Sequence, residues 1–546
     1  MTTNQRLANN MRTAKLLIAA AALLIFPACK KELQESPGAI TSLTTNITGD
    51  IVMQPLESRQ VSVKVLPEDV AADVPEFKLL DEGGRKPAVL ALNYEKSTGN
   101  TYFFTINDIR DNHQAYEFSL HFQYGGISSD SFTVRSAGEE QQPSATPVPI
   151  VYITTSVAQN RITKDTWVDG KIRIDGNGSD YDLEEMATQI KGRGNSTWNW
   201  EKKPYALKLD KKQSLIGRPK HKRWCLIANY MDKTDMRNRL AYHIAANTKL
   251  DYAVGNEFAE VYFNGAYQGL YMITEQVKED ANRVNITEVD EKSTTTNPAD
   301  IGYLLEFDTY YDEAGKFTSA TTRIPVNIKY PDREDFQAAY NDAQFQKYLN
   351  YIKGEVDAID KAVAALASGG RTSAVWDKLD KESMIEVWLV YEVMCNHEML
   401  WPKSLYFYKE KGNKLKAGPV WDFDWGTLKS SEYNTWLNYN VGNVNEGWGR
   451  NNWWNVLLKY DSDFKASVKR RWQEMYPFLL TLPSFVDSEK ARIAEAEVRN
   501  RAKWPNIKDT TNPNGDESLS FDNAVARLKS TLSSRIEWLN SQISNW

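Results

Sequence analysis

Two aspartates lie among three aromatic side chains in the stretch Ala417-Gly418-Pro419-Val420-Trp421-Asp422-Phe423-Asp424-Trp425-Gly426. The residues before them predict a strand over Lys414–Val420 that ends at this acidic pair. Side chains alternate between the two faces of an extended chain, so Asp422 and Asp424 are expected on one side and Phe423 on the other. Carboxylates enclosed by tryptophans need either a metal cation or an Arg or Lys side chain nearby. Oxygen ligands of this kind favour Mg²⁺ or Mn²⁺.

A glycine-rich turn and a lysine-bearing segment lie far upstream of the aspartates. The turn is Lys191-Gly192-Arg193-Gly194-Asn195-Ser196-Thr197-Trp198. Its glycines and hydroxyls suit a turn that presents backbone N–H groups to phosphate, although an ordinary surface turn has the same composition. The next segment predicts a strand with Ala206 and Lys208 on one face. Lys208, or the nearby Lys203, can neutralise phosphate there, and a solvated edge lysine is the alternative.

A hairpin follows within residues 260–277. Asn264-Gly265 stands between two runs of alternating apolar residues, which predicts a type I′ turn. Glu275 ends the second strand of this hairpin. It is therefore a candidate partner for the lysine of the preceding strand.

Together these segments resemble the CotH kinase family, whose motifs occur here in the same order over residues 149–470. The family resemblance implies a bilobal, atypical protein-kinase-like fold that uses ATP and Mg²⁺ or Mn²⁺. The six motifs are KGRGNSTW, KKPYALKL, Leu215-Ile216-Gly217 with Trp224, Asp232-Lys233-Thr234 with Arg237-Asn238, the NGAYQGLY–TEQV hairpin and VWDFDWGT.

On the phosphate side, the resemblance implies that a lysine contacts ATP and that a glutamate orients this lysine. The residues at those positions and in the adjoining turn are Lys208, Lys203, Glu275, Arg193 and Asn195. On the metal side, Asp422 resembles the metal-binding aspartate of a kinase Asp-Phe-Gly motif, with Asp424 close by.

The sequence departs from the family where a catalytic aspartate and a metal-binding asparagine are usual. Glu398 stands at the position of the catalytic base and Ser404 at that of the second metal ligand. A glutamate is one methylene longer, and a misplacement of about 1 Å can lower a rate roughly 100-fold. Two functions therefore stay open: phosphoryl transfer to a protein Ser/Thr, or a pseudokinase module that binds a protein or glycan. A two-carboxylate glycosidase ranks last, because sequence cannot locate a pair about 5–10 Å apart.

The composition is that of a globular α+β protein. Of 546 residues, 41% are hydrophobic and 25% charged, and the net charge of −6 disfavours general binding to nucleic acid. Three cysteines cannot form a disulfide framework. Cys225 and Cys395 lie in apolar stretches, which favours buried free thiols over a single disulfide.

The N-terminus has the features of an export signal. Leu16–Ala28 is apolar and follows Arg12 and Lys15; its 13 residues fall short of the roughly 20 that cross a bilayer. Phe26-Pro27-Ala28-Cys29 resembles a bacterial lipobox, and Lys30-Lys31-Glu32 resembles the export tags of Bacteroidetes-type surface lipoproteins. We expect an extracytoplasmic protein of the outer membrane or cell surface, attached only by a lipid on Cys29. A plain signal with an incidental cysteine is the alternative.

Composition and periodicity divide the chain into successive parts. These are a signal peptide (1–28), a tether (29–47), a small Ig-like β-sandwich (48–137), a linker (138–148), the kinase-like domain (149–470) and a helical C-terminal extension packed on it (471–546). The expected strands include Gln60–Leu66, Tyr102–Ile106, Tyr116–Tyr124, Ser129–Val134 and Ser404–Lys409. The expected helices are Met236–Thr248, Phe336–Leu366, Glu382–Met394, Asp463–Tyr476, Ser488–Lys503 and Asp522–Ile543.

Overall fold

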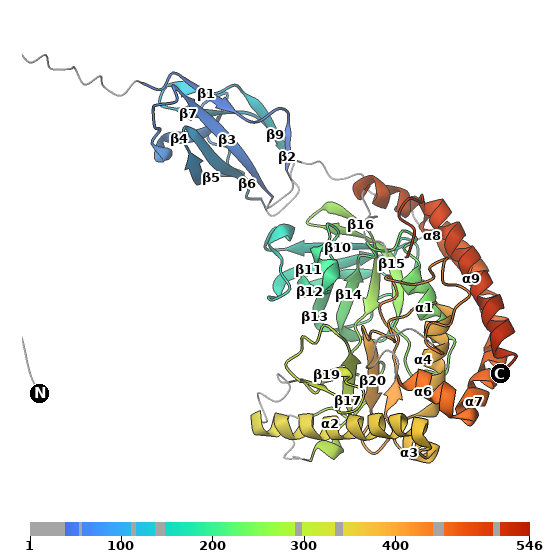
Figure 1. The fold of residues 1–546 in the computed structure, drawn as a ribbon. Coiled ribbons are helices and arrows are strands. Elements are labelled where there is room, and N and C mark those ends of the chain that lie inside the picture. The colour runs from blue at the N-terminus through green and yellow to red at the C-terminus, as the bar shows by residue number, and fades with distance from the viewer. Residues whose placement is uncertain are drawn as a thin grey trace, which may run out of the picture.

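A computed structural model of the chain (Figure 1) describes residues 39–53, 57–110, 116–136, 148–289, 297–332, 342–440, 452–505 and 514–546. The export signal, the lipobox cysteine and most of the linker therefore lie outside the described residues. The described part of the chain is rich in β-sheet in its N-terminal region and helical in its C-terminal region, which confirms the mixed α+β class.

The first part has two sheets on one hydrophobic core, because alternate residues of the strands are apolar. Val63, Phe104 and Phe122 are among its fully buried side chains. One sheet has the order β1 (Ser42–Thr45), β3 (Ser58–Leu66), β6 (Thr101–Asp108) and β5 (Leu90–Thr98). The other has the order β2 (Ile51–Met53), β9 (Phe132–Ser136), β7 (Glu117–Tyr124) and β4 (Phe77–Asp81), with β8 (Ile127–Ser128) on β7.

The second part is a closed seven-stranded barrel. Alternate side chains, such as Leu207 and Trp224, fill its interior. A parallel pairing of the first and last strands closes it, with Ile150 opposite Glu260. Its order is β10 (Ile150–Thr155), β11 (Val168–Asp175), β12 (Leu183–Gly192), β13 (Tyr205–Gln213), β14 (His221–Ile227), β16 (Ala266–Glu275) and β15 (Asn256–Phe263).

The Asn264-Gly265 hairpin forms as the sequence predicts. The two residues join β15 to β16 with φ angles of 49° and 78°. Both central residues of a type I′ turn need positive φ, which asparagine and glycine tolerate best.

The third part joins a five-stranded sheet to helices around a second, larger core. The sheet has the order β18 (Lys316–Thr318), β19 (Pro325–Tyr330), β17 (Tyr303–Phe307), β20 (Leu405–Lys409) and β21 (Lys416–Ala417). The helices are α1 (Arg237–Ala246), α2 (Asp342–Ala365), α3 (Thr372–Trp376), α4 (Lys381–Val393), α6 (Trp453–Tyr460), α7 (Ser462–Leu479), α8 (Leu482–Lys503) and α9 (Phe521–Ile543).

Most expected elements match within a few residues, and one is much shorter. The strand expected over Lys414–Val420 is reduced to β21, because Gly418 has a φ of 109° and Pro419 has no N–H to donate to a ladder. The expected helix from Phe336 is described only from Asp342, since residues 333–341 lie outside the described parts.

Helices α8 and α9 run along the outside of the barrel and of the other helices (Figure 1), and α8 packs against β16. Arg535 of α9 donates to a Glu392 carboxylate oxygen of α4 at 2.8 Å, and both side chains are almost fully buried. The C-terminal helices therefore share the core of the third part. Among the described helices, none combines the length and apolar character that crossing a membrane requires.

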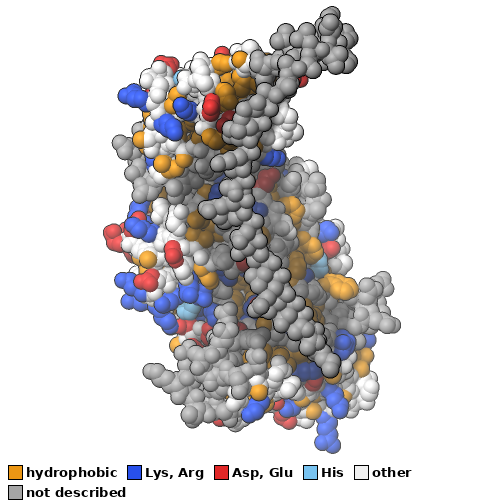
Figure 2. Space-filling model, turned by 90° about the vertical axis from the view of Figure 1, so that its left-hand side faces the viewer, with side chains coloured by type: hydrophobic (Ala, Val, Ile, Leu, Met, Phe, Trp, Pro, Cys, Tyr) orange, Lys and Arg blue, Asp and Glu red, His pale blue; other side chains and the backbone are white. Residues whose placement is uncertain are grey.

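Figure 2 shows one face of the molecule in space-filling form, with basic and acidic side chains spread over it and apolar ones between them. Both cysteines that the structure describes, Cys225 and Cys395, are buried free thiols, as their apolar surroundings predict.

Candidate active site

A cavity of about 690 Å³ is lined by residues of both the barrel and the five-stranded sheet. Ala206, Cys225 and Ile227 line it from the barrel, and Glu306 and Tyr406 line it from the sheet. Cavities of about 300–1,000 Å³ typically hold small ligands and cofactors. The volume and the mixed apolar and charged lining fit a nucleotide.

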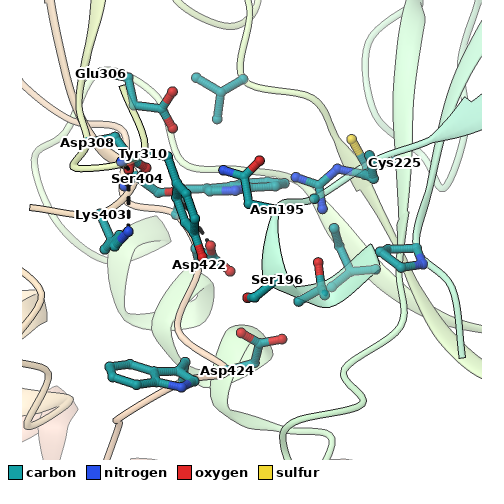
Figure 3. A pocket seen from close by; sticks show the side chains of 18 of the residues that line it. Asn195, Ser196, Cys225, Glu306, Asp308, Tyr310, Lys403, Ser404, Asp422 and Asp424 are labelled. Carbon is teal, nitrogen blue, oxygen red and sulfur yellow. Dashed lines mark hydrogen bonds and ion pairs between the residues drawn. The ribbon is translucent and has the colours of Figure 1, made fainter. Parts of the chain in front are cut away.

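The acidic residues singled out in the sequence, Asp422, Asp424 and Glu398, all line this cavity, and so does Ser404. Figure 3 shows Asp422, Asp424 and Ser404 among its lining side chains. Each of the two aspartates, Asp422 and Asp424, shifts the pKa of the other, so their carboxyl groups are close neighbours. The Ser404 hydroxyl donates to Asp422 Oδ2 at 3.4 Å. The structure thus brings the expected metal ligands and the expected base to one place.

The backbone around the aspartates is irregular, not extended as expected. Asp422 adopts a left-handed φ of 71°. The amide N–H of Phe423 donates to Asn238 Oδ1 at 2.6 Å. The buried Phe423 ring packs against the Tyr391 ring, with 4.8 Å between the ring centres. Phe423 therefore anchors the loop in the core, while Asp422 and Asp424 face the cavity.

Burial and mutual repulsion raise the pKa values of these acids. For Asp424, burial is the main cause, followed by the neighbouring charge of Asp422. The pKa of Glu398 is raised by burial and by Asp422 and Asp424. Burial also raises the pKa of Asp422, although Arg193 opposes the shift. A bound cation would relieve this repulsion, which fits a metal site.

Metal coordination would need a ligand in addition to the protein. Among the described residues, no group of three or more His, Cys, Asp or Glu side chains is arranged to hold a metal ion. Mg²⁺ commonly takes one or two carboxylates and completes its shell with water and substrate phosphates. The paired aspartates and the Ser404 hydroxyl suit that mode.

The glycine turn lies at the same cavity and presents Arg193 and Asn195. A Cβ on Gly192 would lie 2.4 Å from the Trp198 ring, and Gly194 has a φ of 82°. Both positions therefore require glycine. Burial works against the charge of Arg193, but the nearby Cys225 and Asp422 outweigh it and raise the pKa of the guanidinium.

Three residues expected at the phosphates do not line the cavity. Lys203 donates to the Trp198 carbonyl at 2.6 Å. Lys208 lies opposite Arg223 on the barrel wall, two residues beyond the cavity-lining Ala206. Glu275 is fully buried, accepts from the Gly255 amide at 2.8 Å and pairs with arginines, so the expected Lys208–Glu275 pair is not formed. Its partners are Arg218 at 3.6 Å and Arg283 at 3.5 Å.

The sequence analysis did not identify a group of acidic and basic side chains that line another part of the same cavity. Glu306 and Asp308 lie at the end of β17 and just beyond it, with Lys329 3.2 Å from Glu306 and Lys403 3.8 Å from Asp308. The Ser404 amide donates to Asp308 Oδ2 at 3.0 Å. Tyr303–Asp308 ends a strand with acidic residues at alternate positions, a pattern that could have identified them.

Three aromatic residues of the cavity wall are partly exposed to solvent. Tyr310, Trp401 and Trp425 retain 46%, 47% and 41% of their accessible surface. They are among the most exposed large hydrophobic residues in the described chain. Solvent-exposed rings beside a cavity are typical of a binding surface.

Unfolding at different pH values tests the electrostatics of the site. Burial, with Glu306 nearby, raises the pKa of Asp308 to about 6, above the unfolded value of about 3.9. This group's stabilising contribution is therefore present below about pH 4 and is lost as the pH rises through 6. Between pH 4.5 and 6.5, we expect the unfolding free energy of Asp308→Asn to fall less steeply than that of wild type. The difference in slope is at most about 1.4 kcal/mol per pH unit. Urea titrations at each pH measure these free energies. If the free energies of wild type and Asp308→Asn change in parallel with pH, the raised pKa of Asp308 is contradicted.

The sequence motifs and the cavity agree with one family comparison. A family model described as CotH kinase protein matches residues 190–539. The chain belongs to the CotH kinase family. The match begins in β12 and ends in α9, so the CotH region runs beyond residue 470 and takes in the C-terminal helices.

Other comparisons add little to the CotH assignment. No curated protein matches the chain. Domains 5–6 of the S-layer protein SbsC are 12% identical over 43% of this chain and 97% of that one, with a TM-score of 0.14. The Escherichia coli adhesin FdeC is 10% identical over 44% of this chain and 90% of that one, also with a TM-score of 0.14. TM-scores this low do not indicate a common fold.

Proposed function

We propose that this CotH protein transfers phosphate from ATP to serine or threonine of a protein, with Mg²⁺ or Mn²⁺ as cofactor. The observation that carries the proposal is the pair of neighbouring aspartates, Asp422 and Asp424, which lines a cavity of nucleotide size together with Arg193. Two neighbouring carboxylates gain stability when a cation lies beside them, because it offsets their mutual repulsion.

The proposed architecture is that of an atypical, bilobal kinase. The barrel would form one lobe and the helical part the other, with the cavity as the nucleotide cleft. Support comes from the two separate cores and from the cavity lining, to which both parts contribute. The two-sheet part would be an Ig-like spacer.

Asp422, Asp424 and the Ser404 hydroxyl would hold the metal, and Arg193 with the glycine turn would hold the phosphates. The metal, when bound, supplies positive charge that stabilises the phosphates. Arg193 suits this role because a guanidinium stays charged and can donate two hydrogen bonds to phosphate oxygens. Lys403 and Lys329 contribute further positive charge at the cavity wall.

Glu398 would accept the proton of the acceptor hydroxyl. Its backbone N–H donates to Asn396 Oδ1 at 2.8 Å, which fixes its position in the wall. Burial and the neighbouring Asp422 and Asp424 raise the pKa of this carboxyl in the metal-free protein. A cation held by the two aspartates would oppose that shift and favour the carboxylate form that a general base requires.

Binding of Mn²⁺·ATP tests the proposal directly. We expect a rise in the melting temperature of the purified protein that requires ATP and Mn²⁺ together, because the aspartates and the phosphates share one cation. Differential scanning fluorimetry, followed by calorimetric titration, measures it. The control is ATP with EDTA. Absence of binding at millimolar nucleotide would overturn the kinase proposal.

A pseudokinase module is the second candidate, and the residue at position 404 favours it. Serine is shorter than the usual asparagine, and its hydroxyl contacts Asp422 at the limit of a hydrogen bond. The exposed rings of Trp401 and Trp425 would then contact a protein or glycan without phosphoryl transfer. Nucleotide binding without transfer to any serine or threonine substrate would support this alternative.

We also propose that the protein is exported and anchored to the cell envelope by a lipid on Cys29. The support is the apolar run and the lipobox-like sequence at the N-terminus. Mass spectrometry of the mature N-terminus tests this, since an unmodified Cys29 would exclude the anchor.

A further inference from the structure

We propose that Asn514 is a positioning residue that ties the Asp424 loop to the Met231 segment of the cavity wall. The metal-related part of this inference rests on the proposed function. Asn514 lies between α8 and α9, about 90 residues from Asp424 in sequence. It does not line the cavity itself.

The side chain of Asn514 contacts two separate segments of the site. Its Nδ2 donates to the carbonyl of Asp424 at 2.8 Å and to that of Met231 at 3.2 Å. Its Oδ1 accepts from the amide of Thr427 at 2.9 Å. Met231 and Asp424 both line the cavity, so one amide connects two of its walls.

Arg237 holds the other side of the same loop. Its Nε donates to the carbonyl of Thr427 at 2.7 Å, and its Nη2 lies 2.7 Å from Asp516 Oδ2. Asp516 follows Asn514 by two residues, so the α8–α9 connection contacts the loop both directly and through Arg237. Arg237, Asn514 and Asp516 are each 1% exposed.

Loss of the Asn514 amide would leave the Asp424 and Met231 carbonyls without this donor. The Asp424 carboxylate would then be held less firmly beside Asp422. Groups that orient metal ligands typically change metal affinity by about 10–100-fold when they are removed. We therefore expect Asn514 to affect the metal more than the nucleotide.

The first test measures Mn²⁺ affinity, from the electron paramagnetic resonance of free Mn²⁺, in the presence of ADP. We expect Asn514→Ala and Asn514→Asp to bind Mn²⁺ about tenfold more weakly or worse. The aspartate variant still accepts from the Thr427 amide but cannot donate to Asp424. The affinity of both variants for ADP without metal should stay within about threefold of the wild-type value. A general folding defect would lower this affinity as well.

The matched control is Asn500→Ala in α8. Asn500 is also fully buried, and its Oδ1 accepts from a backbone amide, that of Leu270 at 3.1 Å, on the barrel side. Its loss should lower the melting temperature comparably while leaving Mn²⁺ affinity near wild type. Equal Mn²⁺ affinities of Asn514→Asp, Asn500→Ala and wild type would overturn the inference.

A second measurement needs no ligand. Hydrogen–deuterium exchange of the Thr427 amide in the metal-free protein should be at least tenfold faster in Asn514→Ala than in Asn500→Ala. If wild type binds no Mn²⁺, the proposed function fails, and this exchange rate alone decides whether Asn514 positions the loop. Unchanged exchange at Thr427 would then refute the positioning role.

Discussion

Replacement of Asp422 by asparagine is expected to abolish phosphoryl transfer and to make the metal-free protein more stable. Loss of a ligand that holds the charge-neutralising cation costs several kcal/mol, which corresponds to a rate loss of about 10³-fold or more. Without metal, the raised pKa of Asp422 shows that its environment disfavours the charge. A neutral isostere removes that penalty.

Transfer of radiolabelled γ-phosphate and thermal unfolding in EDTA measure both effects. For a domain of 150–250 residues, about 1 kcal/mol corresponds to a melting-temperature change of roughly 2–4 °C. The matched control is Asp360→Asn, since Asp360 is fully buried but accepts from Thr322 and Trp453 in the core. This control should lose stability and keep activity. More than a tenth of wild-type transfer by Asp422→Asn would refute the proposed role.

The second large effect is expected from Arg193 and not from Lys208. Arg193 lines the cavity near Asp422, with its guanidinium 5.4 Å from the centre of the Trp421 ring. Lys208 is on the barrel wall outside the cavity lining. Arg193→Ala should weaken Mn²⁺·ATP binding about 100-fold, because charge-assisted hydrogen bonds to phosphate are lost. Lys208→Ala should change it less than threefold.

Calorimetric titration of the two variants with Mn²⁺·ATP decides between these residues. Arg193→Ala removes both the positive charge beside Asp422 and the planar pair of hydrogen-bond donors. It should therefore be compared with Arg193→Lys, which keeps the charge but loses the planar donor pair. Intermediate affinity of the lysine variant is expected. A larger loss in Lys208→Ala than in Arg193→Ala would return the phosphate role to the strand lysine.

Local sequence patterns predicted the parts of the fold whose determinants are contiguous. The Asn264-Gly265 turn needs only its own two residues and the apolar runs beside them. Helices α4 and α9 were expected within two residues of their observed bounds, since α9 has regular apolar spacing and α4 is a continuous, largely apolar segment. The acidic pair was found because both carboxylates stand in one short motif.

Side-chain pairs set by the tertiary structure could not be predicted in this way. Ala206 of β13 lines the cavity. Lys208 follows it by two residues, which places Lys208 about 6–7 Å farther along the strand and outside the cavity lining. Glu275 pairs with Arg218 and Arg283, from segments whose approach depends on how the barrel closes. Asn514 meets Asp424 only because α8 and α9 fold back over the loop.

The closed barrel limits how the proposed protein substrate could be recognised. Every barrel strand already has neighbours on both sides, since β10 pairs with β11 and with β15. An extended peptide that binds by adding a strand needs an unpaired edge, and a closed barrel offers none. If the proposed protein substrate approaches the cavity from this side, it would therefore engage loops and side chains. Its selectivity would then come from ring and charge contacts and not from main-chain pairing.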